Sequence, residues 1–216
     1  MNIITISRQF GSGGRELGKR LSEYLGYDYY DKEIIVSIAE KLKLDEKYIE
    51  NMSEKLVVQD FHFHFGYSFG NNITNLDTGM EILKTQTDII HNIANKGENF
   101  IIIGRAADAL LRNYNPFNVF VYADMKSKIS RCLDRDQTKS EKDAKELERQ
   151  ILKIDNQRAK YCSMIGDGKW GDKDRYNLCL NTSNVHIKDI VPSVGEYAKA
   201  FFKTVNTPFE HKYNFD

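Results

Sequence analysis

The sequence has no excess charge of either sign. Its 31 basic and 31 acidic residues cancel to a formal net charge of zero, so the whole chain has no bulk attraction for nucleic acid or for an anionic membrane. We therefore expect neither as a partner. Positive charge can contribute to function only where the fold concentrates it locally.

The sequence also lacks paired cysteines and long apolar runs. Its three cysteines, Cys132, Cys162 and Cys179, lie far apart and form no C-x-x-C pair, which argues against a disulfide framework and against a zinc site. No apolar segment approaches the roughly 20 residues of a membrane helix, and the N-terminus does not resemble a secretory signal. We expect a soluble, cytoplasmic protein.

The composition that is present suits one globular domain. A length of 216 residues lies within the range of about 50 to 250 residues for a domain. With 41% hydrophobic and 29% charged residues, the chain can bury a core and still cover itself with polar side chains.

Short apolar runs alternate with helical patterns along the chain. Strands are expected at residues 3–6, 99–104, 118–123 and 176–180, and helices at 17–25, 106–113 and 187–202. This alternation predicts an α/β fold with a mainly parallel sheet. Two segments interrupt it, at about 32–96 and 134–170, and we expect both to be largely helical.

A glycine loop, Gly11-Ser12-Gly13-Gly14, joins the first expected strand to the first expected helix. Glycine lets the backbone approach an anion closely, and the start of a helix offers unsatisfied N–H groups. Arg8 and Arg15 flank the loop, so we interpret it as a phosphate-binding loop. The alternative is a tight turn with no ligand.

The loop departs from the usual P-loop pattern, G-x-x-x-x-G-K-[ST]. Arg8 stands at the position of the first glycine, Gly14 at the lysine and Arg15 at the serine or threonine. The pattern's lysine reaches the β- and γ-phosphates, and its hydroxyl binds Mg²⁺. Other residues must therefore supply both groups. The candidates for the cation are Arg8, Arg15 and Lys19, and those for the metal ligand are Ser12, Glu16 or a carboxylate elsewhere.

Five segments, read together, resemble the cytidylate kinase-like family of P-loop proteins. They are ISRQFGSGGRE at residues 6–16, YYDK at 29–32, IGRAAD at 103–108, DNQRAKY at 155–161 and YNLCLNTS at 176–183. Each motif alone is weak, but their order and separation are specific for the family. The resemblance covers about residues 2–202.

The resemblance implies a P-loop NTPase fold with three layers, a five-stranded sheet and a single domain over residues 1–207. The core would comprise residues 1–31, 97–133 and 171–207. Residues 32–96 would form a helical monophosphate-binding insertion, and residues 134–170 a helical lid. Residues 208–216 would be a C-terminal tail. Members that are true cytidylate kinases transfer the γ-phosphoryl group of ATP to CMP or dCMP with Mg²⁺.

The resemblance also implies roles for individual residues. Three of them would bind the acceptor: Asp31 at the first position of a D-T-G motif, Arg105 in a G-R-D motif, and Asp108 in place of that motif's acid, where Ala106 stands. Asp155 and Arg158 match a D-S-x-R element of the lid and, with Arg15, would act in catalysis. The remaining role, ATP binding, falls to Arg8, Gly11, Ser12, Gly13, Gly14, Arg15, Glu16, Arg131 and Arg135.

Arg131 and Arg135 are four residues apart on an expected helix and share a face that could close over the donor nucleotide. The alternative is ordinary surface pairing with Asp134 or Asp136. His62 and His64 alternate with phenylalanines; we favour a flap that stacks on a base or forms a homodimer contact over a metal pair.

Three functions remain open from the sequence. The first is an ATP-dependent kinase acting on CMP or dCMP. The second is a regulatory protein that binds nucleotides with little transfer, because the P-loop lysine and hydroxyl are replaced. The third is a small-molecule kinase with an acceptor that is not a nucleotide, because Lys32 and Glu33 depart from the acceptor motif.

Overall fold

The chain folds around a sheet of five strands in the computed structural model, which describes residues 1–43, 73–135, 143–166 and 168–205. The strands are β1 (Ile3–Arg8), β2 (Asp28–Tyr30), β3 (Phe100–Ile103), β4 (Phe117–Tyr122) and β5 (Leu178–Asn181). They lie in the order β2-β3-β1-β4-β5, and neighbouring strands are parallel. The predicted α/β fold with a five-stranded parallel sheet is confirmed.

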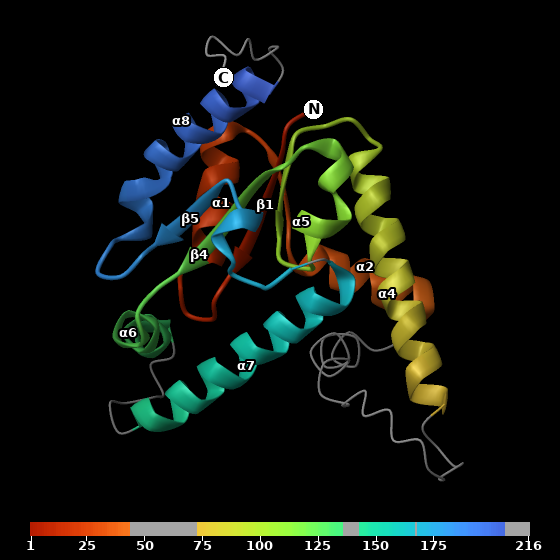
Figure 1. Ribbon diagram of the computed structural model, residues 1–216, viewed down its shortest axis with the longest axis horizontal. Coiled ribbons are helices and arrows are strands. Elements are labelled where there is room, and N and C mark those ends of the chain that lie inside the picture. The colour runs from red at the N-terminus through yellow and green to blue at the C-terminus, as the bar shows by residue number, and fades with distance from the viewer. Residues whose placement is uncertain (44–72, 136–142, 167, 206–216) are drawn as a thin grey trace, which may run out of the picture.

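Helices pack against both faces of the sheet and along the edge where β1 ends (Figure 1). They are α1 (Gly14–Leu25), α2 (Lys32–Leu42), α4 (Ile73–Ala94), α5 (Ala107–Leu110), α6 (Met125–Arg135), α7 (Ala144–Ile165) and α8 (Ile187–Val205), with short 3₁₀ turns at Arg112–Tyr114 and Lys173–Arg175.

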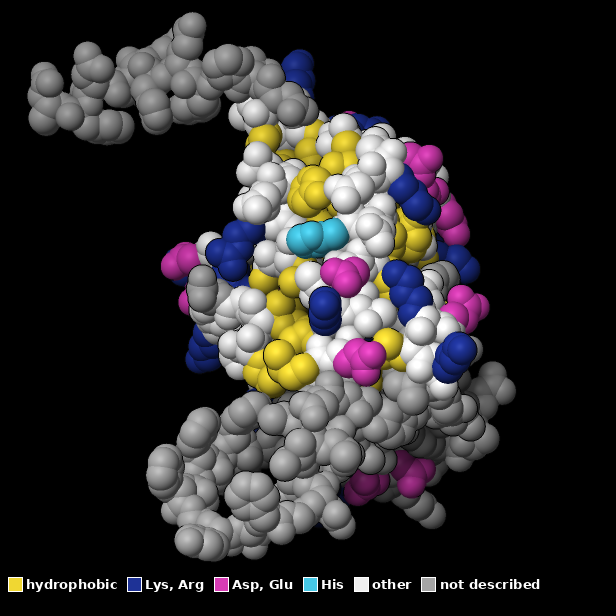
Figure 2. All heavy atoms as spheres, turned by 90° about the vertical axis from the view of Figure 1, so that its right-hand side faces the viewer, with side chains coloured by type: hydrophobic (Ala, Val, Ile, Leu, Met, Phe, Trp, Pro, Cys, Tyr) yellow, Lys and Arg dark blue, Asp and Glu magenta, His cyan; other side chains and the backbone are white. Residues whose placement is uncertain are grey.

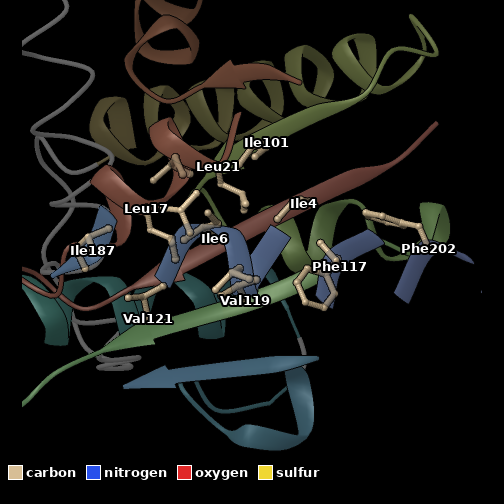
Figure 3. Close-up of a cluster of buried hydrophobic side chains, with 14 residues drawn as sticks. Ile4, Ile6, Leu17, Leu21, Ile101, Phe117, Val119, Val121, Ile187 and Phe202 are labelled. Carbon is tan, nitrogen blue, oxygen red and sulfur yellow. The ribbon is translucent and has the colours of Figure 1, made fainter. Parts of the chain in front are cut away.

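Side chains that alternate along each strand divide the hydrophobic core between the two faces of the sheet. Ile4 and Ile6 of β1 pack with Leu17 and Leu21 of α1 and with α8, as Figure 3 shows. Ile3 points to the other face, where α2, α4 and α5 cover the sheet. Successive residues of a strand point to opposite faces, so two helix layers enclose the sheet. The predicted three-layer arrangement follows directly from this pattern.

Two element boundaries differ from the sequence-based expectation. The helix expected at 106–113 starts only at Ala107 and gives way to a 3₁₀ turn, because Ala106 adopts a left-handed φ of 50° and cannot belong to the helix. The strand expected to start at Tyr176 starts at Leu178, because Tyr176 caps the preceding 3₁₀ turn.

In the part of the chain that the structure describes, no helix is long and apolar enough to cross a membrane. Figure 2 shows basic and acidic side chains interspersed over the face that carries α4. His62 and His64, with the segment around them, and the tail at 208–216 lie outside the described residues.

Candidate functional site

The glycine loop lies between the end of β1 and the start of α1, as predicted. Gly13 caps α1 with a φ of 82°, and Gly11 has a φ of 74°, a region that residues with a side chain rarely adopt. A Cβ on Gly11 would lie 2.9 Å from the carbonyl oxygen of Lys128. The loop therefore requires glycine both for its backbone conformation and for its contact with α6.

The turn that follows β5 forms a hydrogen bond with the glycine loop. The Thr182 hydroxyl donates a hydrogen bond of 2.7 Å to the carbonyl oxygen of Ser12. Arg131, which we predicted to bind ATP, donates to the carbonyl oxygens of Thr182 and Val185. Burial lowers the pKa of Arg131. In this arrangement Arg131 positions the turn that holds the loop.

Three arginines from distant parts of the chain converge beside the loop. Arg8 at the end of β1, Arg105 after β3 and Arg158 on α7 all line one cavity of about 80 Å³. The lining is completed by Ser7, Gly104, Ile154, Gln157, Tyr161, Cys162 and Trp170. Among the residues that the structure describes, the lining contains three guanidinium groups and no carboxylate.

The electrostatics of the cavity favour an anion. Burial, together with the positive charges of Arg158 and Arg105, lowers the pKa of Arg8 to about 9, while Asp31 opposes the shift. Arg8 stays protonated at neutral pH, but its charge is stabilised less than in water. A bound anion would relieve both the desolvation and the repulsion between the guanidinium groups.

The backbone after β3 places Arg105 in an uncommon conformation. Gly104, Arg105 and Ala106 have φ values of 70°, 59° and 50° in succession, and for residues with side chains such angles cost free energy that surrounding contacts must offset. Gln86 makes such a contact, because its amide donates to the carbonyl oxygen of Arg105 and to Tyr161 Oη. A Cβ on Gly104 would overlap the Arg8 guanidinium. The strained turn therefore brings Arg105 and Arg8 together.

Arg15 and Asp31 form an ion pair at the end of β2, with Arg15 Nε 2.5 Å from Asp31 Oδ2. Tyr29 Oη lies 3.5 Å from the same oxygen. Burial and the charge of Asp31 raise the pKa of Tyr29 to about 12. The sequence assigned Arg15 to catalysis and the donor, and Asp31 to the acceptor; the structure brings the two side chains into direct contact.

Asp155 binds the backbone of Phe10, the residue directly before the glycine loop. Its Oδ1 accepts a hydrogen bond of 2.6 Å from the backbone N–H of Phe10, and its Oδ2 lies 3.3 Å from Lys128 Nζ. Arg158 Nη1 is 3.9 Å from Oδ1. Burial raises the pKa of Asp155, while the N–H of Phe10 and the Lys128 charge act in the opposite direction.

Sequence reasoning missed Lys128. The only signal for it is spacing, because Lys128, Arg131 and Arg135 stand at positions i, i+3 and i+7 and so share one face of α6.

Asp108 does not line the arginine cavity. Its buried carboxylate lies 2.9 Å from Arg175 Nη2, on the 3₁₀ turn before β5. Burial raises its pKa, and the Arg175 charge opposes this effect. Asp108 is therefore paired with Arg175 and, unlike Arg105, does not line this cavity.

A second hollow of about 250 Å³ is lined by residues of α1, α6 and the start of α8. Arg135 and Glu16 meet there, with 3.8 Å between Arg135 Nη2 and Glu16 Oε2. The hollow is lined by Glu16, Arg131, Asp134, Arg135, Val185, His186, Ile187 and Lys188. The predicted ATP-binding residues thus extend from the loop into this hollow.

The candidate Mg²⁺ ligands differ in how well they fit the ion. The Ser12 side chain is fully buried, and its hydroxyl donates to the carbonyl oxygen of Gln9. The Glu16 carboxylate is partly exposed beside the loop. Among the described residues, no group of three or more acidic, histidine or cysteine side chains could enclose a metal ion. Mg²⁺ commonly binds through one or two carboxylates together with substrate phosphates, and Glu16 fits that mode.

Solved structures with the same fold include several kinases. An uncharacterized protein from Eubacterium ventriosum is 24% identical, with a TM-score of 0.65 over 93% of this chain and 99% of that chain. Shikimate kinase from Bacteroides thetaiotaomicron is 15% identical, with a TM-score of 0.52 over 92% and 98% of the two chains. A gluconokinase from Sinorhizobium meliloti is also 15% identical, with a TM-score of 0.52 over 94% and 95%. These likenesses show a shared fold.

No curated protein matches this chain significantly in sequence. The model of the cytidylate kinase-like family, in contrast, matches residues 3–184, which is most of the chain. That range includes the glycine loop, the three arginines of the cavity, and Asp155 with Lys128. The chain therefore belongs to the cytidylate kinase-like family.

Proposed function

We propose that this protein transfers the γ-phosphoryl group of ATP to a small anionic acceptor, and that CMP or dCMP is that acceptor. The observation that carries the proposal is the convergence of Arg8, Arg105 and Arg158 on one cavity beside the glycine loop. Guanidinium groups suit the oxygens of a phosphate monoester. The acceptor phosphate would bind in this cavity and the donor phosphates at the loop.

Phosphoryl transfer depends on in-line positioning and on cations around the moving charge more than on a strong base. Arg158 sits between the two sites: it lines the cavity, and its Nη1 donates a hydrogen bond of 3.0 Å to the carbonyl oxygen of Arg8. In the proposed reaction Arg158 neutralises charge on the transferred group. Arg105 orients the acceptor, and Arg15 holds Asp31 at the acceptor's edge.

Bound with ATP, Mg²⁺ would neutralise charge on the donor phosphates, and we propose Glu16 as one of its ligands. The partly buried face of α7 would help to exclude water, since Arg158 attaches this helix to the carbonyl oxygen of Arg8 at the end of β1. We therefore propose residues 134–170 as the lid, residues 32–96 as the acceptor-binding insertion and the remainder of 1–207 as the core.

The direct test is ADP formation with ATP, Mg²⁺ and a panel of nucleoside monophosphates. We expect saturable turnover with CMP or dCMP and less with other monophosphates. Absence of turnover with every monophosphate would contradict the acceptor assignment. Calorimetry with ATP on the same sample would then separate a nucleotide-binding regulator, which binds without turnover, from a protein that binds no nucleotide.

The size of the cavity is equally compatible with a second candidate acceptor. The arginine cavity measures only about 80 Å³, which suits the anionic group of a small molecule as well as it suits a phosphate monoester. A small carboxylic or phosphorylated acid is therefore the alternative acceptor. Including such acids in the panel distinguishes the two, because the better acceptor will show the higher kcat/KM at saturating ATP.

A further inference from the structure

The position of the P-loop lysine cannot carry a side chain in this protein. Gly14 occupies it, and a Cβ there would lie 2.6 Å from the Cβ of Arg8 and 3.2 Å from that of Val121. A longer side chain would have to displace the end of β1 or β4. If the protein binds a nucleoside triphosphate, the cation for its terminal phosphates must therefore come from another element.

The three cations that the sequence suggested for this role do not lie where the terminal phosphates of ATP would bind. Arg15 is paired with Asp31, and Arg8 packs against Gly104 in the acceptor cavity. Lys19 is exposed on α1, beyond the loop. Lys128, in contrast, lies under the loop: its side chain is only 6% exposed, and its backbone contacts Gly11.

The Asp155 carboxylate occupies a position where one anion contacts both Lys128 and the backbone just before the glycine loop. One carboxylate oxygen accepts the N–H of Phe10, and the other faces Lys128 Nζ at 3.3 Å. A backbone N–H of a glycine-rich loop and an ammonium group are the donors that P-loops offer to phosphate oxygens. The anion at this position is the Asp155 carboxylate of α7, whereas the two donors, the Phe10 N–H and Lys128 Nζ, lie outside α7.

We propose that Lys128, from α6, replaces the missing P-loop lysine and binds the terminal phosphates of the donor nucleotide at the position marked by the Asp155 carboxylate. Gln9 Oε1, 3.2 Å from Lys128 Nζ, holds the ammonium group toward the loop. Asp155 then competes with the phosphates for these donors, and its withdrawal makes them available. The inference rests on the proposed use of ATP.

Calorimetric binding of ATP and of AMP tests the assignment without requiring turnover. Lys128→Gln keeps a polar side chain beside Gln9 but removes the charge, and should weaken ATP binding at least tenfold, since a charge-assisted bond contributes about 1.5–3 kcal/mol. AMP binding should change much less, because AMP has no β- or γ-phosphate. Lys128→Arg should recover most of the ATP affinity. Lys126→Ala, an exposed lysine on the same helix, is the matched control and should behave as the wild type.

Asp155→Asn provides a second test that leaves Lys128 in place. It should bind ATP at least as tightly as the wild type, because the competing charge is gone; a tenfold loss would overturn the proposal. Equal ATP affinity in the wild type and in a folded Lys128→Gln variant would also overturn it, while leaving the proposed function intact. A wild type that binds no ATP would instead refute the proposed function.

Discussion

The Arg158 guanidinium donates a hydrogen bond of 3.0 Å to the carbonyl oxygen of Arg8, and its Cζ lies 5.8 Å from the centre of the Phe10 ring. A side chain of α7 therefore contacts the last residue of β1 and Phe10, which directly precedes the glycine loop. Because Arg158 also lines the arginine cavity, one residue connects the proposed donor and acceptor sites.

Arg158→Ala should lower kcat/KM for the acceptor at least tenfold. The variant loses a charge-assisted contact to phosphate, which contributes about 1.5–3 kcal/mol. Steady-state ADP formation with CMP measures the effect. Arg149→Ala is the matched control, because Arg149 is an exposed arginine of the same helix, paired with Glu146. Equal losses in both variants would show that Arg158 acts only through the stability of α7.

Arg15→Ala should raise the acceptor KM, although the sequence assigned this arginine to the donor. Its partner Asp31 would lose the ion pair that holds it at the end of β2. Asp31→Asn should therefore have a similar effect, and the double variant should be little worse than either single one, since the two residues act as a unit. Additive effects in this cycle would contradict a shared role. Glu23→Ala, at an exposed position later on the same helix, should leave KM unchanged.

The parts of this protein that the sequence predicted well are those that neighbouring residues determine. The β-branched run at Ile3–Ile6 and the glycines that follow it specify a strand, a tight loop and a helix within one short segment of the sequence. The apolar runs at 99–104 and 118–123 likewise predict buried parallel strands. The Arg8, Arg105 and Arg158 positions came from motifs, and the fold brings them to one cavity.

The pairing of side chains depends on the tertiary structure and could not be predicted from local sequence patterns. Asp108 meets Arg175, which is 67 residues away, and no local pattern indicates that contact. No local pattern predicts the burial of Lys128 under the glycine loop, because that burial results from the packing of α6 against Gly11. Local patterns therefore predicted the elements, while the ion pairs that shape the site required the fold.

Gly11→Ala should destabilise the fold and weaken nucleotide binding. The residue has a φ of 74°, and its new Cβ would lie 2.9 Å from the Lys128 carbonyl oxygen. Backbone strain of this kind costs about 1–3 kcal/mol, and each kcal/mol lowers Tm by about 2–4 °C in a chain of this size. Gly97→Ala is the control, because Gly97 has a φ of 79° but nothing within 4 Å of its Cβ position. A larger loss of Tm for Gly11→Ala, seen by calorimetry, would isolate the packing contribution.

Asp108 should make the stability of the protein depend on pH at values above the usual pKa of an aspartate side chain. Burial raises the pKa of Asp108 from its usual 3.8, so near that value the native chain keeps a proton that the unfolded chain releases. The resulting stabilisation is complete below the unfolded pKa and is lost as the pH rises through the native pKa.

The free energy of unfolding of the wild type, relative to Asp108→Asn, should therefore fall as the pH rises above the usual aspartate pKa of 3.8. Urea denaturation at a series of pH values measures this difference. Asp124→Asn gives a control of opposite sign, because hydrogen bonds from Ser127 lower the pKa of Asp124, so its contribution is lost as the pH falls. Parallel curves for the wild type and Asp108→Asn would show that the Arg175 charge fully offsets the burial of this carboxylate.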